Sequence, residues 1–163
     1  MTSIAVRADF FDASALVKLH VQEEGSEIIR PYFNRQPTKY TTPFCYYEAL
    51  NVLKVKWLYR KEIVKEQYLD AAFRLTAWFG STSRGVKDID FTEPATFQAA
   101  TRIVDRTSLD LSDAFQILSV KIGYFSPLCG DSQTLLVTGD KGLATAARAE
   151  GLRVWYFMGE PAP

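Results

Sequence analysis

Two apolar segments far apart in the chain each lead into an aspartate at the start of a helix-favouring segment. An apolar run ending at Phe11 precedes Asp12, and residues 13–21 favour a helix. The continuous apolar segment 134–138 is typical of a strand inside a parallel sheet, and Asp140 follows it. Because the carboxyl ends of parallel strands lie at one edge of a sheet, Asp12 and Asp140 are expected to converge there.

The rest of the chain alternates between helix and strand patterns. Further helices are predicted over 24–34, 43–60, 62–77, 94–106, 112–122 and 141–150, and further strands over 39–42, 86–91 and 152–157. The helices over 43–60 and 62–77 should form a hairpin with a short turn at 60–61. No repeat or linker interrupts the pattern. It predicts one α/β domain over 1–158, a three-layer α/β/α sandwich with a central, mostly parallel sheet, and a tail over 159–163.

Composition limits the classes of function. The 163 residues fit one domain, and 19 Lys and Arg balance 19 Asp and Glu, so a polyanionic partner would need local positive charge or a metal. Charges at Arg7 and Asp9 interrupt any signal peptide, and no apolar run reaches the length of a membrane span. Cys45 and Cys129 have no Cys or His company, which favours reduced thiols. We therefore expect a cytoplasmic protein with no membrane association.

Two more acids lie on predicted helices. Glu48 shares an apolar helix face with Phe44 and Val52, where an unpaired carboxylate would be costly, so it needs a buried Lys or Arg or a bound cation. Asp113 lies in the first turn of its helix, on the face of Gln116. There it could simply favour the helix dipole by about 0.3 to 1 kcal/mol.

Asp12 also has a simpler interpretation. Asp is a favoured N-cap residue, because its side chain accepts a hydrogen bond from a backbone N–H of the first turn. Together, however, Asp12, Glu48, Asp113 and Asp140 would repel one another unless a divalent cation neutralised them. Oxygen ligands without His or Cys favour Mg²⁺ or Mn²⁺. The single histidine, His20, is expected to serve ordinary packing.

Four short segments resemble the PIN-domain family of metal-dependent ribonucleases, and most of all the VapC-type toxins of bacterial toxin–antitoxin pairs. They occur in the order found in that family and cover nearly the whole chain. They are Asp12-Ala13-Ser14-Ala15-Leu16-Val17-Lys18, Tyr46-Tyr47-Glu48-Ala49-Leu50-Asn51, Leu111-Ser112-Asp113-Ala114-Phe115 and Thr138-Gly139-Asp140-Lys141-Gly142-Leu143.

The resemblance implies a fold, an activity and partners. It implies a PIN-like α/β/α domain in which Asp12, Glu48, Asp113 and Asp140 are catalytic and bind Mg²⁺ or Mn²⁺, with Ser14 and Thr138 as supporting hydroxyls. It implies an endoribonuclease that cleaves single-stranded or looped RNA by activating a water. It also implies a homodimer, formed by helices like those within 43–77, and a cognate antitoxin that blocks the site.

Some residues fall outside this pattern. The segment 123–133 is longer than the usual connection before the fourth acidic strand. Asp9, Asp110 and Asp131 are additional acids, for which we expect solvent exposure or capping. Lys18 and Lys54 are candidates for contacts with RNA phosphates, although the favoured interpretation of each is a solvated surface lysine.

Two alternatives remain open from the sequence. One is a catalytically silent PIN-like module that binds RNA or protein and keeps its acids as caps. The other is a different Mg²⁺-dependent phosphotransfer fold, such as a phosphatase or a receiver-like domain. The second alternative is weaker, because no second Asp follows Asp12 at the phosphatase spacing and no strand end carries a suitable lysine.

Overall fold

A four-stranded parallel sheet lies at the centre of the protein. The computed structural model describes residues 7–123 and 134–163, and within them the strand order is β2-β1-β3-β4, with every neighbouring pair parallel. The strands are β1 (Ala8–Phe11), β2 (Lys39–Tyr40), β3 (Thr134–Thr138) and β4 (Arg153–Tyr156). The predicted α/β class and the parallel sheet are confirmed.

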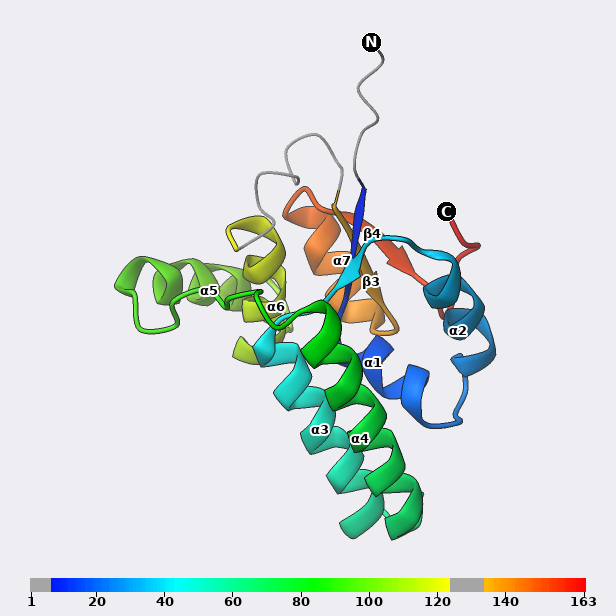
Figure 1. Cartoon of the computed structure of the whole chain (residues 1–163). Coiled ribbons are helices and arrows are strands. Elements are labelled where there is room, and N and C mark those ends of the chain that lie inside the picture. The colour runs from blue at the N-terminus through cyan, green and yellow to red at the C-terminus, as the bar shows by residue number, and fades with distance from the viewer. Residues whose placement is uncertain (1–6, 124–133) are drawn as a thin grey trace.

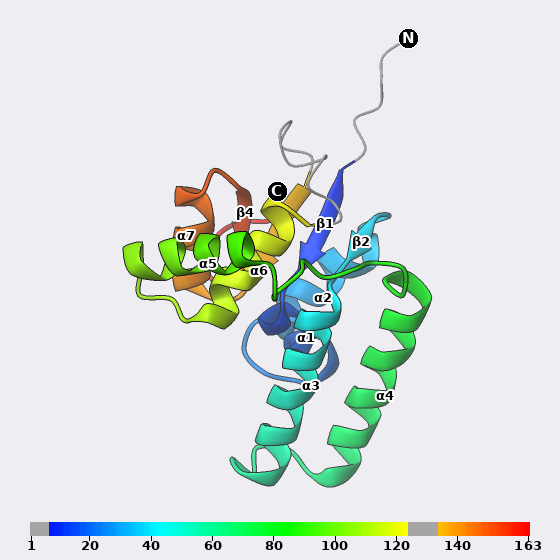
Figure 2. The same ribbon diagram turned by 90° about the vertical axis from the view of Figure 1, so that its left-hand side faces the viewer.

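Helices cover both faces of the sheet. Figure 1 shows the sheet between the group α5, α6 and α7 and the group that contains α1 and α2. Figure 2 shows α5, α6 and α7 gathered on one side of the chain, away from α4. Helices α3 and α4 form a hairpin that projects away from the sheet. Their bounds are α1 Ala13–His20, α2 Ser26–Arg35, α3 Pro43–Leu58, α4 Lys65–Thr82, α5 Pro94–Arg106, α6 Leu111–Lys121 and α7 Lys141–Ala149.

The two central strands form the core, and both lead into helices at the same edge of the sheet. All residues of β1 and β3 are buried, and Phe10 and Phe11 of β1 pair with Leu136 and Val137 of β3. Burial on both faces explains why β3 is apolar without alternation. Asp12 caps α1, in agreement with its simpler interpretation, and Asp140 likewise caps α7, each by accepting a hydrogen bond from a backbone N–H of the first turn.

One predicted strand is absent. Residues 86–91 contain no strand, and the two buried residues, Val86 and Ile89, are three positions apart, which does not fit the period of two of a strand. Asp88 instead accepts a hydrogen bond from the backbone N–H of Phe44 at the start of α3, at 3.1 Å. The prediction was wrong because the burial of these residues does not alternate, and because a strand also needs a neighbouring strand for its backbone hydrogen bonds.

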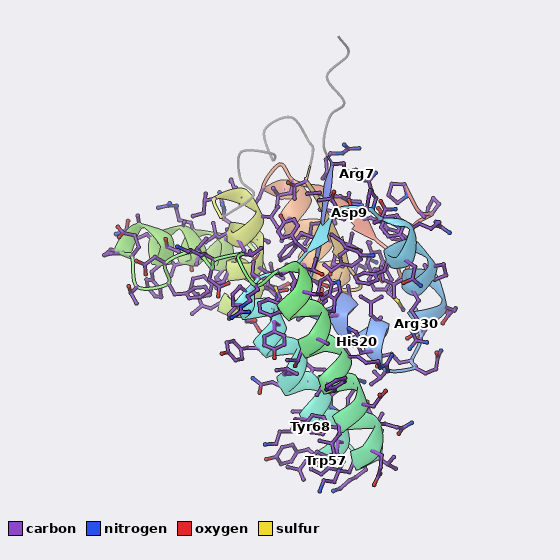
Figure 3. The ribbon with its side chains drawn as sticks, in the orientation of Figure 1. Arg7, Asp9, His20, Arg30, Trp57 and Tyr68 are labelled. Carbon is purple, nitrogen blue, oxygen red and sulfur yellow. The ribbon has the colours of Figure 1, made fainter. Side chains whose placement is uncertain are left out.

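The helical hairpin differs in detail from its prediction. The connection between α3 and α4 extends from 59 to 64, and α4 continues to Thr82, past the predicted end at 77. Trp57 and Tyr68 stack at the end of the hairpin, with ring centroids 5.0 Å apart, where Figure 3 shows them. No helix within the described residues is both long enough and apolar enough to cross a membrane.

Asp9 and Glu150 hold elements together outside the predicted site. Asp9 was expected to be exposed or capping, but it is 1% exposed in β1 and accepts hydrogen bonds from Tyr32 and Arg7. Figure 3 labels Arg7, which precedes β1, beside Asp9 of β1. Glu150, which follows α7, forms ion pairs with Arg106 of α5 at 2.5 Å and with Lys121 of α6 at 2.8 Å. It therefore joins the C-terminal ends of three helices.

Candidate active site

Asp12 is fixed at the end of β1 by three hydrogen bonds. One carboxylate oxygen, Oδ1, accepts from the Ser14 hydroxyl at 2.8 Å and from the backbone N–H of Ala15 at 2.9 Å. The other, Oδ2, accepts from the Thr138 hydroxyl at 2.5 Å. The side chain is 1% exposed. Burial raises its pKa from 3.8 to about 6, because these hydrogen bonds offset only part of the cost of desolvating the charge.

Ser14 and Thr138 connect the two strand ends through Asp12. The Ser14 hydroxyl accepts from the backbone N–H of Gly139 at 2.9 Å, and the Thr138 hydroxyl accepts from that of Asp140 at 3.0 Å. The sequence analysis selected both residues as supporting hydroxyls. In the structure each contacts Asp12 directly and also ties the start of α1 to the end of β3.

Glu48 projects from α3 toward α6. Its Oε1 accepts from the Ser112 hydroxyl at 2.7 Å, and its Oε2 accepts from the Gln116 side-chain amide at 2.9 Å. The partner that its apolar helix face required is therefore a pair of neutral donors. Partial burial raises the pKa of Glu48 more than the Ser112 hydrogen bond lowers it.

Asp113 and Asp140 have more freedom than Asp12 and Glu48. Asp113 is partly buried, and its Oδ1 receives one long contact from the Gln116 amide, at 3.4 Å. Asp140 is exposed, and its Oδ1 accepts from the backbone N–H of Leu143 at 2.9 Å. Burial, followed by the charges of neighbouring acids, raises the pKa of Asp113 to about 7. The acids act on one another electrostatically, as the sequence analysis expected.

The four predicted acids line a single pocket of about 280 Å³, which we name the acidic pocket. Its lining also includes Ser14, Gln116 and Val52, together with a group of charged residues on one side. The described residues contain no group of three or more acidic, His or Cys side chains already gathered as a metal-binding cluster. Asp12 and Glu48 instead point their oxygens at protein donors, while Asp113 and Asp140 each keep one oxygen without a protein hydrogen bond among the described residues.

The charged side of the acidic pocket contains Lys18, which the sequence analysis selected as a candidate for RNA contact, and three residues that it missed. These three are Glu23, Lys56 and Arg60. Lys56 lies eight residues after Glu48 on α3, a spacing that places both on one helix face and could have identified it. Glu23 lies in the α1–α2 connection, where no periodicity reports the direction of a side chain.

The remaining candidates lie elsewhere. Lys54 is exposed and is not part of the pocket lining. Asp110 caps α6, accepting from the backbone N–H of Asp113 at 2.9 Å. Asp131, Cys129 and all but the first residue of 123–133 lie outside the described residues. Cys45 is a buried free thiol.

A larger pocket, of about 680 Å³, lies near the end of α1 and contains none of the four acids. Its lining includes His20, Arg30 and Arg74, and Figure 3 shows His20 and Arg30 on neighbouring elements. Both ring nitrogens of His20 are buried without a hydrogen-bond partner among the described residues. Burial, assisted by the two arginines, lowers the pKa of His20 to about 4, so the ring is neutral. This is consistent with the packing role expected for His20.

Comparisons with known proteins bear on the fold. No family model matches the chain, and no curated protein matches it. Among solved structures, the crystal structure of PAE2754 from Pyrobaculum aerophilum is similar, with a TM-score of 0.57 and 21% sequence identity, over 93% of this chain and 85% of that one. At this identity the likeness establishes a shared fold across nearly the whole chain.

Proposed function

We propose that this protein is a divalent-metal-dependent endoribonuclease of the PIN-domain type, which hydrolyses RNA phosphodiester bonds with Mg²⁺ or Mn²⁺. The observation that carries the proposal is that four acids from separate parts of the chain line one pocket. Two of them follow the adjacent parallel strands β1 and β3, and two project from α3 and α6. Ligand sites in parallel α/β sheets occupy this edge.

The donor set fits a hard divalent cation. All four candidate ligands are carboxylates, and Mg²⁺ and Mn²⁺ prefer oxygen donors. Their repulsion contributes to the raised pKa of Asp113, and a bound cation would relieve it. Asp113 and Asp140 each have a carboxylate oxygen free of protein hydrogen bonds within the described chain, and their partial exposure lets them adjust to a cation.

The protein contributes fixed carboxylates to the proposed reaction. When bound, the cation would polarise a phosphodiester oxygen and lower the pKa of a water. Ser14 and Thr138 keep Asp12 in one orientation, and Ser112 and Gln116 do the same for Glu48. Hydrogen-bonded carboxylates of this kind supply negative charge at defined positions without reorganisation during the reaction.

The test combines metal binding with mapping of RNA ends. Asp113→Asn removes one charge without removing a helix cap, and Asp105→Asn on the exposed face of α5 is its matched control. We expect wild type and Asp105→Asn to bind Mn²⁺ calorimetrically and to produce new RNA ends that EDTA abolishes. We expect Asp113→Asn to remain folded and lose both properties. Equal cleavage by Asp113→Asn and wild type would overturn the proposal.

The proposal extends to a toxin role, with a cognate antitoxin, in the cytoplasm. Inducible expression should arrest growth for wild type and not for Asp113→Asn.

A homodimer is also proposed, because the α3–α4 hairpin exposes large apolar side chains, among them Phe73 at 74% and Leu69 at 53%. Sedimentation analysis should give a dimer that Phe73→Glu converts to a monomer.

The alternative of a silent RNA- or protein-binding module has one observation in its favour. The oxygens of Asp12 and Glu48 are already engaged by protein donors, as structural acids would be. Metal titration separates the two functions. Absence of Mg²⁺ and Mn²⁺ binding, alone and with RNA, would select the silent module.

A further inference from the structure

A carboxylate holds two lysines together at the side of the acidic pocket. Glu23 Oε1 accepts from Lys18 Nζ at 2.8 Å, and Glu23 Oε2 pairs with Lys56 Nζ at 2.6 Å. The lysines come from α1 and α3, and all three residues line the pocket with the four acids. An anion between two converging ammonium groups is the arrangement that a phosphate-binding site would also have.

These lysines are unusually confined for residues of their type. The Lys18 and Lys56 side chains are only 17% and 12% exposed. Lys18 runs past two glycines: a methyl group at Gly139 would lie 3.2 Å from Lys18 Cε, and one at Gly25 would lie 3.4 Å from Lys18 Cδ. At Gly139 the methyl group would crowd the lysine stem and, at 2.9 Å, the ring of Phe157; at Gly25 its contact with the lysine would be an ordinary one. The fold thus provides a path that directs Lys18 into the pocket.

Glu23 can leave the lysines without a change in the backbone. Its backbone N–H donates to the Ser26 hydroxyl at 3.0 Å, and that hydroxyl donates to the Val21 carbonyl at 2.9 Å. The backbone at Glu23 is therefore fixed at the start of α2, while its side chain is 23% exposed and can rotate toward solvent. After such a rotation Lys56 still has Glu62 as a partner, at 2.6 Å.

Glu23 and Lys56 are both charged at neutral pH. Burial favours the neutral carboxyl of Glu23, but hydrogen bonds and charges from Lys18 and Lys56 outweigh it, so its pKa lies below the ordinary value. Burial likewise opposes charge on Lys56, and its two carboxylate partners raise its pKa. A diester phosphate carries one negative charge and could take the place of the Glu23 carboxylate without changing the charge balance.

We propose that Lys18 and Lys56 bind a backbone phosphate of single-stranded RNA at the edge of the acidic pocket, and that Glu23 occupies this position until RNA displaces it. This inference rests on the proposed function for the identity of the anion. It makes Glu23 a positioning residue that holds the lysines in place and competes with substrate. Removal of Glu23 should strengthen RNA binding, whereas removal of either lysine should weaken it.

The experiment measures binding of a fluorescent single-stranded RNA oligonucleotide by anisotropy in EDTA, where no cleavage takes place. Lys18→Gln and Lys56→Gln should each weaken binding about three- to tenfold and reduce the salt dependence by about one ion. Glu23→Gln should tighten binding about three- to tenfold. The charge-matched controls Lys54→Gln and Glu66→Gln, both at exposed positions outside the pocket, should change binding less than about twofold.

Several outcomes would overturn the phosphate site. Weaker or unchanged binding by Glu23→Gln, in a variant shown by circular dichroism to be folded, would exclude displacement. Equal effects of Lys54→Gln and Lys56→Gln would indicate only a general surface charge. The nuclease proposal is tested separately by Mn²⁺ calorimetry and by RNA cleavage. If wild type neither binds Mn²⁺ nor cleaves RNA but shows the expected pattern of RNA binding, the nuclease proposal is refuted and the phosphate site stands.

Discussion

The junctions β1–α1 and β3–α7 have the same local design and give their aspartates different properties. Asp12 and Asp140 both follow a buried strand and both cap a helix. Asp12 is buried with both oxygens engaged, whereas Asp140 is exposed with one oxygen engaged. The difference arises because the hydroxyls of both junctions, Ser14 and Thr138, donate to Asp12. Equivalent positions in a repeated motif can therefore divide into a fixed carboxylate and an adjustable one.

The largest expected difference between the two aspartates is in RNA cleavage. Under the proposed function, Asp12→Asn should reduce the cleavage rate by about a thousandfold or more, because no neighbouring group can replace a buried, oriented carboxylate. Asp140→Asn should reduce it by about tenfold, because an exposed ligand is more easily replaced by water. Single-turnover cleavage of one RNA oligonucleotide measures both. Equal losses would show that burial and fixed orientation do not rank the two acids.

Thr138→Val should have the next largest effect, on stability. It removes the hydroxyl that donates to Asp12 Oδ2 while keeping the side chain's shape, so a buried carboxylate oxygen loses its partner. The free energy of unfolding should fall by about 1 to 3 kcal/mol in urea denaturation. Thr145→Val on the exposed face of α7 is the control, with an expected change within about 0.5 kcal/mol. Similar values for the two variants would contradict a structural role for the Asp12 contact.

The stability of the metal-free protein should depend on pH through two acids of the pocket, Asp12 and Asp113. Raised pKa values of about 6 for Asp12 and about 7 for Asp113 mean that the folded, metal-free chain binds protons more tightly than the unfolded chain. The free energy of unfolding should therefore fall as the pH rises from roughly 4 to 7. In EDTA we expect Tm to be about 5 °C lower at pH 8 than at pH 5.

Two variants and added Mg²⁺ serve as controls for the predicted fall in stability with rising pH. Asp12→Asn should remove much of the slope, and Asp140→Asn should remove less, because Asp140 affects Asp12 only through its charge. Added Mg²⁺ should raise Tm at pH 8 and flatten the slope, since it binds only the folded state. Rising stability between pH 5 and pH 8 in EDTA would contradict the assigned burial of Asp12.

The smallest effect separates capping from ligation at Asp140. Serine is also a good N-cap residue, so Asp140→Ser should change the free energy of unfolding by less than about 0.5 kcal/mol, whereas Asp140→Ala should lower it by about 1 kcal/mol. Under the proposed function both variants should weaken Mn²⁺ binding equally, because neither has a carboxylate. Full Mn²⁺ affinity in Asp140→Ser would leave Asp140 as a cap alone.

The strand-to-helix junctions could be predicted because their signals are local. An apolar strand, an N-cap and a helical segment identify Asp12 and Asp140, and helical periodicity places Glu48 on a half-buried face. Residues 86–91 were misassigned because a strand depends on a hydrogen-bonded neighbour that may come from anywhere in the chain. Asp9 was misassigned because its partner Tyr32 is supplied by α2, which packs near β1 only in the folded protein.

The contents of the pocket beyond the four acids were harder to predict. Lys56 could be found by its spacing from Glu48. Lys54 was chosen because it lies near Glu48 in the sequence, but that closeness does not determine which face of the helix a lysine occupies. Glu23 depends on the direction of a side chain in a connection whose conformation is set by Ser26 and by Gly25, which has a positive φ of 91°. The direction of a side chain in a loop is determined by tertiary contacts, and these contacts cannot be read from a single sequence.

The Glu150 ion pairs hold together helices that carry acids of the pocket. Asp113 and Asp140 lie at the N-terminal ends of α6 and α7, and Glu150 joins the C-terminal ends of α5, α6 and α7. Because α7 is about 13 Å long, these ion pairs lie roughly that far from the acids at the opposite helix ends. We therefore expect substitutions at Glu150 to loosen the packing of these helices and to affect the spacing of Asp113 and Asp140 without contact with either acid.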